Sequence, residues 1–145
     1  MRIRDATAAD ADSCAAVYAP YVRDTAISFE TEPPGPVEMA ERIAEAQQRH
    51  AWLVVTGDDC RVAGYAYGAP FRGRAAYRWT CEVSVYLAPD ARGRGTGRAL
   101  YEALLARLAE RGERGERGAA SPQVRALRLR TRTRLRTYVR VVSIP

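Results

Sequence analysis

Apolar and polar residues alternate over residues 79–87, WTCEVSVYL. This period of two predicts a β-strand with Trp79, Cys81, Val83, Val85 and Leu87 facing a core and Thr80, Glu82, Ser84 and Tyr86 bordering a polar space. Glu82 is the only charged residue of the run, and a lone carboxylate in a strand costs free energy unless it is hydrogen-bonded or protonated. Glu82 is therefore a candidate general base.

A glycine-rich turn and a helix follow this strand. Pro89 and Asp90 end the strand, and the helix is marked by helical spacing of Leu100, Tyr101, Leu104, Leu105 and Leu108. The turn comprises Arg92, Gly93, Arg94, Gly95, Thr96 and Gly97. Its glycines lie at a helix N-terminus, where unpaired N–H groups favour an anion and a missing Cβ lets a pyrophosphate approach. The turn is neither a P-loop nor a good dinucleotide fingerprint.

The remaining periodicities predict an α/β domain. We expect strands at 2–5, 51–56 and 61–68, helices from Thr7 to about Pro20 or Val22 and from Val37 to His50, and loops at 25–36 and 70–77. Residues 57–60 form a hairpin turn between two of these strands. We interpret His50, the only histidine, as a charged complement to a helix C-terminus and not as a catalytic group.

Several motifs together resemble the GNAT family of N-acetyltransferases. Arg92, Gly95 and Gly97 fit its R-x-x-G-x-G acetyl-CoA signature after a strand that ends V-Y-L. The segments SFETEP at 28–33, VAGYAY at 62–67 and YRWTCEVSVY at 77–86 look like the phosphinothricin N-acetyltransferase branch. The likeness runs over residues 1–112, which we take as the domain, and fails over residues 113–145.

The resemblance implies a mixed, mostly antiparallel sheet flanked by helices, with the C-terminal helix and closing strands missing or replaced. It implies N-acetylation of a small amino-acid-like amine, such as phosphinothricin or methionine sulfoximine, with acetyl-CoA as co-substrate, no metal, and a homodimer. Glu82 would be the base. Cofactor-binding residues would be Val85, Tyr86, Leu87, Arg92, Gly93, Arg94, Gly95, Thr96, Gly97 and Arg98.

The resemblance also suggests an acceptor site. The loop around Phe29 lies over that site in the family, although a core role for Phe29 is an equal alternative. Arg72, Arg74 and Tyr77 match basic residues and a tyrosine of the branch, and guanidinium groups suit phosphinate or carboxylate oxygens. The alternative for this loop is a solvated basic segment.

Charge is divided unevenly between the two parts of the chain. Residues 1–110 hold 13 Arg against 15 Asp and Glu, a net of −2, and residues 111–145 hold 10 Arg against 2 Glu, a net of +8. The overall charge of +6 is therefore no nucleic-acid signal for the domain. The repeat GERGERG suggests a reading-frame change, after which the tail would be aberrant and activity impaired.

Two alternative functions of the chain stay open. One is a truncated CoA-binding domain with little or no turnover. The other, weaker because no aromatic platform accompanies it, is nucleic-acid binding by an edge strand in which Arg128 to Arg136 share one face.

The cysteines and the apolar content of the chain predict its cellular compartment. Cys14, Cys60 and Cys81 are far apart without a C-x-x-C motif, which opposes a disulfide framework and a zinc site. No run reaches membrane-spanning length and the N-terminus has no export signal, so we expect a cytoplasmic protein that does not enter membranes.

Overall fold

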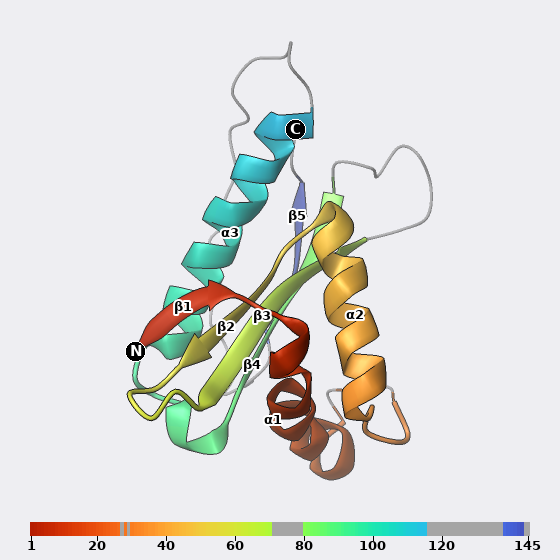
Figure 1. Ribbon diagram of the computed structural model, residues 1–145, viewed down its shortest axis with the longest axis vertical. Helices are drawn as coiled ribbons and strands as arrows, with labels where there is room; N and C mark the ends of the chain where they lie inside the picture. Colours follow the sequence, from red (N-terminus) through yellow and green to blue (C-terminus); the bar gives the residue numbers. More distant parts are fainter. Residues whose placement is uncertain (27, 29, 71–79, 116–137, 144–145) are drawn as a thin grey trace.

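The computed structural model describes residues 1–26, 28, 30–70, 80–115 and 138–143. The helices are α1 (Ala11–Asp24), α2 (Pro36–Arg49) and α3 (Thr96–Gly115), with 3-10 turns η1 (Ala8–Asp10) and η3 (Pro89–Ala91). The strands are β1 (Arg2–Asp5), β2 (Trp52–Thr56), β3 (Val62–Pro70), β4 (Thr80–Leu87) and β5 (Tyr138–Ser143). They form one antiparallel sheet in the order β1-β2-β3-β4-β5, shown in Figure 1. The expected mostly antiparallel sheet flanked by helices is confirmed.

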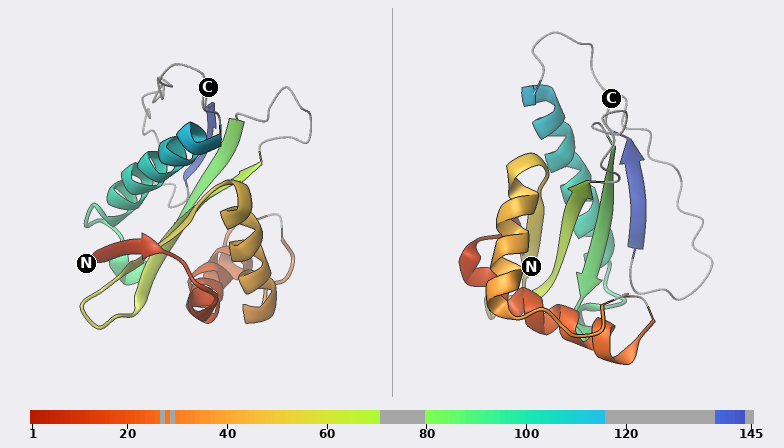
Figure 2. Two further views of the ribbon diagram at one scale, coloured as in Figure 1. Left: turned by 45° about the horizontal axis from the view of Figure 1, so that its top comes forward. Right: turned by 90° about the vertical axis from the view of Figure 1, so that its right-hand side faces the viewer.

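The helices cover opposite faces of the sheet, as Figures 1 and 2 show. Helices α1 and α2 bury one core with the strand residues Trp52, Val54, Tyr65 and Tyr86. Helix α3 buries the other through Leu100, Leu104 and Leu108, which lie against Leu53, Val55, Ala66, Val83, Val85 and Leu87. The sheet is therefore the middle of three layers, and the strands β2, β3 and β4 contribute residues to both cores.

This arrangement corrects one expectation about β4. Ser84 and Tyr86 were expected to border a polar space, yet they are only 7% and 6% exposed. Tyr86 lies edge-on between Tyr18 and Tyr21 of α1, with ring centroids 4.9 and 5.1 Å away. Both faces of the strand are thus covered at Ser84 and Tyr86, whereas Glu82, on the same face, is half-buried.

Helix α1 extends beyond the point at which the sequence predicted its end. Pro20 lies inside the helix, which continues to Asp24. Proline removes one helical hydrogen bond, but Tyr21 and Val22 are buried immediately after it. Their burial offsets that loss because tertiary packing, more than propensity, stabilises helices of this length. Tyr21 is consequently held against the end of β4.

The C-terminal part contains one described strand. Helix α3 ends at Gly115, and β5 then pairs antiparallel with β4 from Thr80 to Val85. The edge strand considered for residues 128–136 lies outside the described residues. The domain boundary at residue 112, and the aberrant origin of the tail, stay predictions.

Candidate active site

The glycine-rich turn places a row of backbone donors at the start of α3. Gly93 and Gly95 have φ angles of +77° and +80°, the left-handed region that favours glycine. A Cβ at either position would meet nothing within 4 Å, so open space adjoins the turn. The Ala99 N–H donates to the Gly95 carbonyl, and this bond begins the hydrogen bonding of α3. The N–H groups of Thr96, Gly97 and Arg98 are the unpaired donors that a helix start presents to an anion.

The end of β4 lies beside this turn, and on one edge no described strand pairs with it. Ala88 donates its N–H to the Ala63 carbonyl on the β3 side, at 2.9 Å. Because main-chain groups alternate along a strand, those of Leu87 point away from β3. Pairing with β5 stops at Val85, so no described strand reaches Leu87. A Cβ on Gly97 would lie 3.2 Å from Leu87 Cδ1, which shows how closely the strand end and the turn approach.

Tyr21 of α1 occupies that edge. Its hydroxyl donates to the Leu87 carbonyl at 2.7 Å and accepts from the Leu87 N–H at 3.2 Å. Arg92, the first residue of the turn, donates from Nη2 to the same hydroxyl at 3.1 Å. The Arg92 guanidinium also lies over the Tyr21 ring, 5.3 Å from its centroid. Strand edge, helix α1 and turn are thereby joined through one phenol.

Arg92 has a buried N–H donor without a hydrogen-bond partner at this junction. Its Nη2 also approaches the Leu87 carbonyl at 3.4 Å, whereas its Nε is buried without a hydrogen-bond partner. A buried unpaired donor carries a desolvation cost, which an arriving acceptor would remove. The side chain is thus suited to an anionic ligand on the turn.

Glu82 lies upstream on β4, on the sheet face covered by α1 and α2. Its cross-strand neighbour on β3 is Ala69, and Ser84 lies opposite Tyr67. Burial chiefly raises the pKa of the Tyr67 hydroxyl, Ser84 opposes the rise by hydrogen bonding, and the negative charge of Glu82 adds to it. Glu82, Ser84 and Tyr67 therefore share one electrostatic environment. Leu87 is five positions after Glu82, roughly 17 Å along an extended strand.

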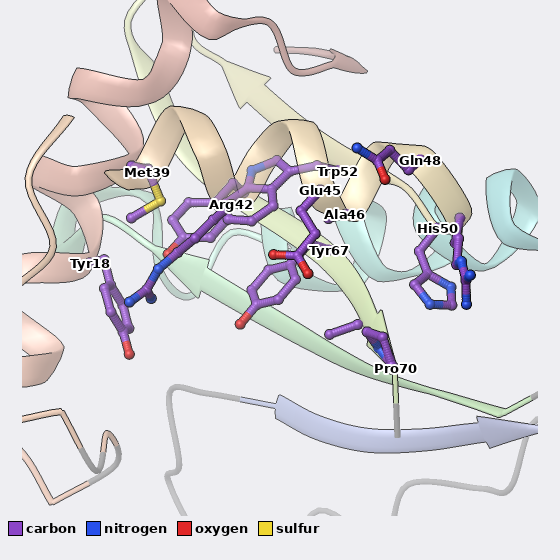
Figure 3. Close-up of a pocket in the computed structure, with 13 residues that line it drawn as sticks. Tyr18, Met39, Arg42, Glu45, Ala46, Gln48, His50, Trp52, Tyr67 and Pro70 are labelled. Carbon is purple, nitrogen blue, oxygen red and sulfur yellow. The ribbon is translucent and has the colours of Figure 1, made fainter. Parts of the chain in front are cut away.

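A cavity of about 440 Å³ opens on this same face between α2 and β3. Figure 3 shows Tyr18 and Arg42 at one end, His50 and Pro70 at the other, and Tyr67 between them. Trp52 forms part of its wall and stacks on Tyr67 with ring centroids 4.4 Å apart. Glu82 does not line the cavity, but its strand partner Ala69 does. The expected base is thus one cross-strand position away from a residue of the cavity wall.

The loop between α1 and α2 is tied down on both sides of Phe29. The hydroxyls of Tyr18 and Ser28 are 2.8 Å apart, and Ser28 Oγ accepts from the Glu30 N–H at 3.1 Å. Arg42 of α2 holds the Glu30 carboxylate with Nη1 at 3.3 Å and a closer bond from Nη2. Hydrogen bonding from Arg42 chiefly lowers the pKa of Glu30, so this carboxylate is ionised at neutral pH. Burial raises the pKa of Tyr18 to about 12 and keeps it protonated.

The structure brings together the expected cofactor residues but leaves the expected acceptor residues undescribed. Val85 through Arg98 converge at the junction of β4 and α3. Phe29, Arg72, Arg74 and Tyr77 lie outside the described residues.

His50 differs from its expected charged state. It caps α2 and is half-buried, and burial, followed by Arg49 and Arg111, lowers its pKa from the ordinary value. The imidazole is therefore neutral at neutral pH, and it does not complement the helix dipole with a charge.

Sequence reasoning missed Tyr21, Tyr18 and Arg42. Tyr18 and Tyr21 are three residues apart and so share a helix face, and two tyrosines on a buried face signal hydroxyls in need of partners. Arg42 carried no such signal because its partner Glu30 lies in a loop.

The described part of the chain has neither a metal-binding cluster nor a membrane-spanning helix. No cluster of three or more His, Cys, Asp or Glu side chains there is arranged for a metal ion. Cys14 is a buried free thiol and Cys60 an exposed one. None of the described helices is long and apolar enough to cross a membrane.

Comparison with known proteins identifies close relatives. Phosphinothricin N-acetyltransferase of Alcaligenes faecalis is 44% identical over 98 residues, which cover 68% of this chain and 50% of that protein. The L-methionine sulfoximine/L-methionine sulfone acetyltransferase of Pseudomonas paraeruginosa is 38% identical over 110 residues, covering 72% and 62%. The chain thus spans about half to three fifths of the length of these two relatives.

A solved structure and a family model agree with these relatives. The GNAT superfamily phosphinothricin acetyltransferase (Pat) from Sinorhizobium meliloti, in complex with AcCoA, is 38% identical with a TM-score of 0.72. The match covers 75% of this chain and 60% of that one. The model of the acetyltransferase (GNAT) family matches residues 17–131, which extends past the predicted boundary at residue 112. With its sheet between two helical layers and its glycine turn after β4, this chain belongs to the acetyltransferase (GNAT) family.

Proposed function

We propose that the protein is an acetyl-CoA-dependent N-acetyltransferase acting on a small amino-acid-like amine. The observation that carries this proposal is the junction at which the edge of β4 at Leu87 meets the donor-lined turn of Gly93 and Gly95. A strand edge suits the amides of a pantetheine arm, and a helix N-terminus suits a pyrophosphate. The site for the pantetheine arm and the site for the pyrophosphate thus lie side by side.

The residues of the junction fit that co-substrate. Main-chain groups of Val85 and Leu87 would hold the pantetheine arm, with Tyr86 between them, and the turn from Arg92 to Arg98 would hold the pyrophosphate. The unpaired amides at the start of α3 and the buried Nε of Arg92 supply donors for phosphate oxygens. When bound, acetyl-CoA supplies the acetyl group as an activated thioester.

Glu82 is proposed as the general base. An amine is mostly an ammonium ion at neutral pH and has no lone pair until a proton is removed, directly or through a water. Glu82 is half-buried on β4, an inner strand of the sheet, and its cross-strand neighbour Ala69 lines the cavity. Its carboxylate can therefore receive that proton away from bulk solvent.

The acceptor is proposed to be of the phosphinothricin or methionine sulfoximine type. The support is the names of the relatives and the anchored loop at Ser28 and Glu30. Phe29, Arg72, Arg74 and Tyr77 are proposed as its contacts on resemblance alone. The same resemblance supports a homodimer, and separated cysteines without a C-x-x-C motif support a reducing, cytoplasmic location.

One observation favours a second candidate, a domain that would hold CoA through the turn and Leu87 but, without Val85, would place the acetyl group poorly and give little turnover. Val85 and Leu87 have the same strand parity, and Val85 faces Tyr138 of β5. Pairing there would occupy the main-chain groups of Val85 that the proposal gives to pantetheine. The two candidates share cofactor binding and differ in catalysis.

A thiol-release assay tests the proposal. We expect CoA release with phosphinothricin or methionine sulfoximine, and a fall in kcat of about 10²–10⁴-fold in Glu82→Gln. Glu41→Gln is the matched control, because Glu41 is exposed on α2. Acetyl-CoA binding without turnover would select the second candidate, and an absence of binding would refute both.

A further inference from the structure

We propose that the Tyr21 hydroxyl is an internal ligand of the cofactor edge, which an amide of the bound cofactor displaces. The inference rests on the proposed function and assigns a role to a residue of α1, outside the strand and the turn. Leu87 offers one N–H and one carbonyl, both directed away from β3. An extended amide presents the complementary carbonyl and N–H.

Tyr21 already satisfies both groups. Its oxygen donates a proton to the Leu87 carbonyl at 2.7 Å and accepts from the Leu87 N–H at 3.2 Å. One hydroxyl thus performs the two tasks that a ligand amide would perform with two separate atoms. Both sets of bonds require the same space beside Leu87, so they exclude each other.

The same hydroxyl also restrains the turn. Arg92 donates to it at 3.1 Å, although Arg92 has a further buried donor, Nε, that lacks a partner. Departure of the hydroxyl from the edge would release Arg92 Nη2 together with Leu87. Amide binding on the strand and anion binding on the turn are therefore coupled through Tyr21.

The energetic consequence has a definite sign. The hydroxyl bonds stabilise the unliganded protein and are lost on binding, so they oppose cofactor binding. Removing the hydroxyl takes this stabilisation from the free state alone. The ring of Tyr21, which is 2% exposed and packs against Tyr86, stays in place in a phenylalanine variant.

Titration calorimetry of Tyr21→Phe with acetyl-CoA tests the inference. We expect Kd to fall roughly threefold to tenfold, the equivalent of one neutral hydrogen bond. Tyr18→Phe is the matched control: it removes a hydroxyl from the same helix face, but that hydroxyl meets Ser28 and not Leu87. Its Kd for acetyl-CoA should equal that of the wild type.

Hydrogen exchange provides a readout independent of affinity. The Leu87 amide should exchange slowly in the free wild type, faster in Tyr21→Phe, and slowly again in both proteins with acetyl-CoA. An unchanged or weaker affinity in Tyr21→Phe, with a wild type that binds, would overturn the competition but leave the proposed function intact. A wild type that does not bind acetyl-CoA would overturn both.

Discussion

The guanidinium of Arg4 and the carboxylate of Asp10 form a two-pronged ion pair, with both N–O distances 2.7 Å. The Asp10 carboxylate also accepts from the Thr7 N–H at 2.8 Å and the Thr7 hydroxyl at 3.0 Å. The pair joins the end of β1 to the start of α1, which carries Tyr18 and Tyr21. It therefore fixes the first helix relative to the sheet.

We expect Asp10→Asn to lower the free energy of unfolding by roughly 1.5–3 kcal/mol at pH 7, because a charged hydrogen-bond acceptor is lost while Asp10 is 6% exposed. Urea denaturation measures the change. Asp12→Asn is the control, since Asp12 lies two residues after Asp10 and is exposed. Equal stability of both variants would show that the pair contributes nothing.

The same pair gives a pH dependence. Hydrogen bonding from Arg4 chiefly lowers the pKa of Asp10 below its ordinary value. A carboxyl group of lowered pKa stabilises the fold above its unfolded pKa, near 3.9, and this contribution disappears as pH falls through the folded pKa. The stability difference between wild type and Asp10→Asn should therefore shrink below about pH 4. A difference that stays constant from pH 7 to pH 3 would contradict this.

Gly93→Ala and Gly95→Ala should each weaken acetyl-CoA binding. A side chain at positive φ costs roughly 1–2 kcal/mol, so the turn would shift away from its donor-lined form. No steric clash contributes, because a Cβ there meets nothing within 4 Å. Calorimetry measures the affinity.

Gly35→Ala is the control for these two variants. A Cβ at Gly35 also meets nothing within 4 Å, but its φ is −77°. Gly35→Ala should therefore leave the affinity unchanged. Equal losses in all three variants would indicate that backbone conformation is not the cause.

Gly64→Ala should destabilise the protein by about 1–3 kcal/mol through overpacking. Its Cβ would lie 2.7 Å from the Tyr86 carbonyl oxygen and 2.5 Å from Leu87 Cδ2. Because one contact is backbone, the end of β4 must move, and acetyl-CoA affinity should fall with stability. Thermal unfolding and calorimetry together check both effects, and a fully stable variant would mean that β4 yields without cost.

Arg42→Gln should raise KM for the amine while leaving Kd for acetyl-CoA unchanged. The variant loses the ion pair that holds Glu30 beside the acceptor loop, on the face away from the turn. Steady-state kinetics with phosphinothricin provides KM, and Arg23→Gln, an exposed change on α1, is the control. A change confined to acetyl-CoA affinity would contradict this role.

Local features of the site could be read from the sequence. The period of two from Trp79 to Leu87 and the glycines before Leu100 predicted a strand, a turn and a helix, and β4 and α3 confirm them. Such features depend on neighbours along the chain, so the sequence displays them directly. The prediction that the second face of β4 borders a polar space was wrong, because Tyr18 and Tyr21, which cover Tyr86, come from α1, far away along the chain.

The sequence by itself determined the alternation of β4, the positive φ that only glycine adopts readily, and the family to which the chain belongs. Tertiary structure alone decided that Tyr21 occupies the edge of Leu87, that Arg42 anchors Glu30, and that His50 is kept neutral. The physical reason is range: periodicity and backbone preference are local. A hydroxyl or an ion pair, in contrast, acquires its partner only when distant segments pack together and exclude water.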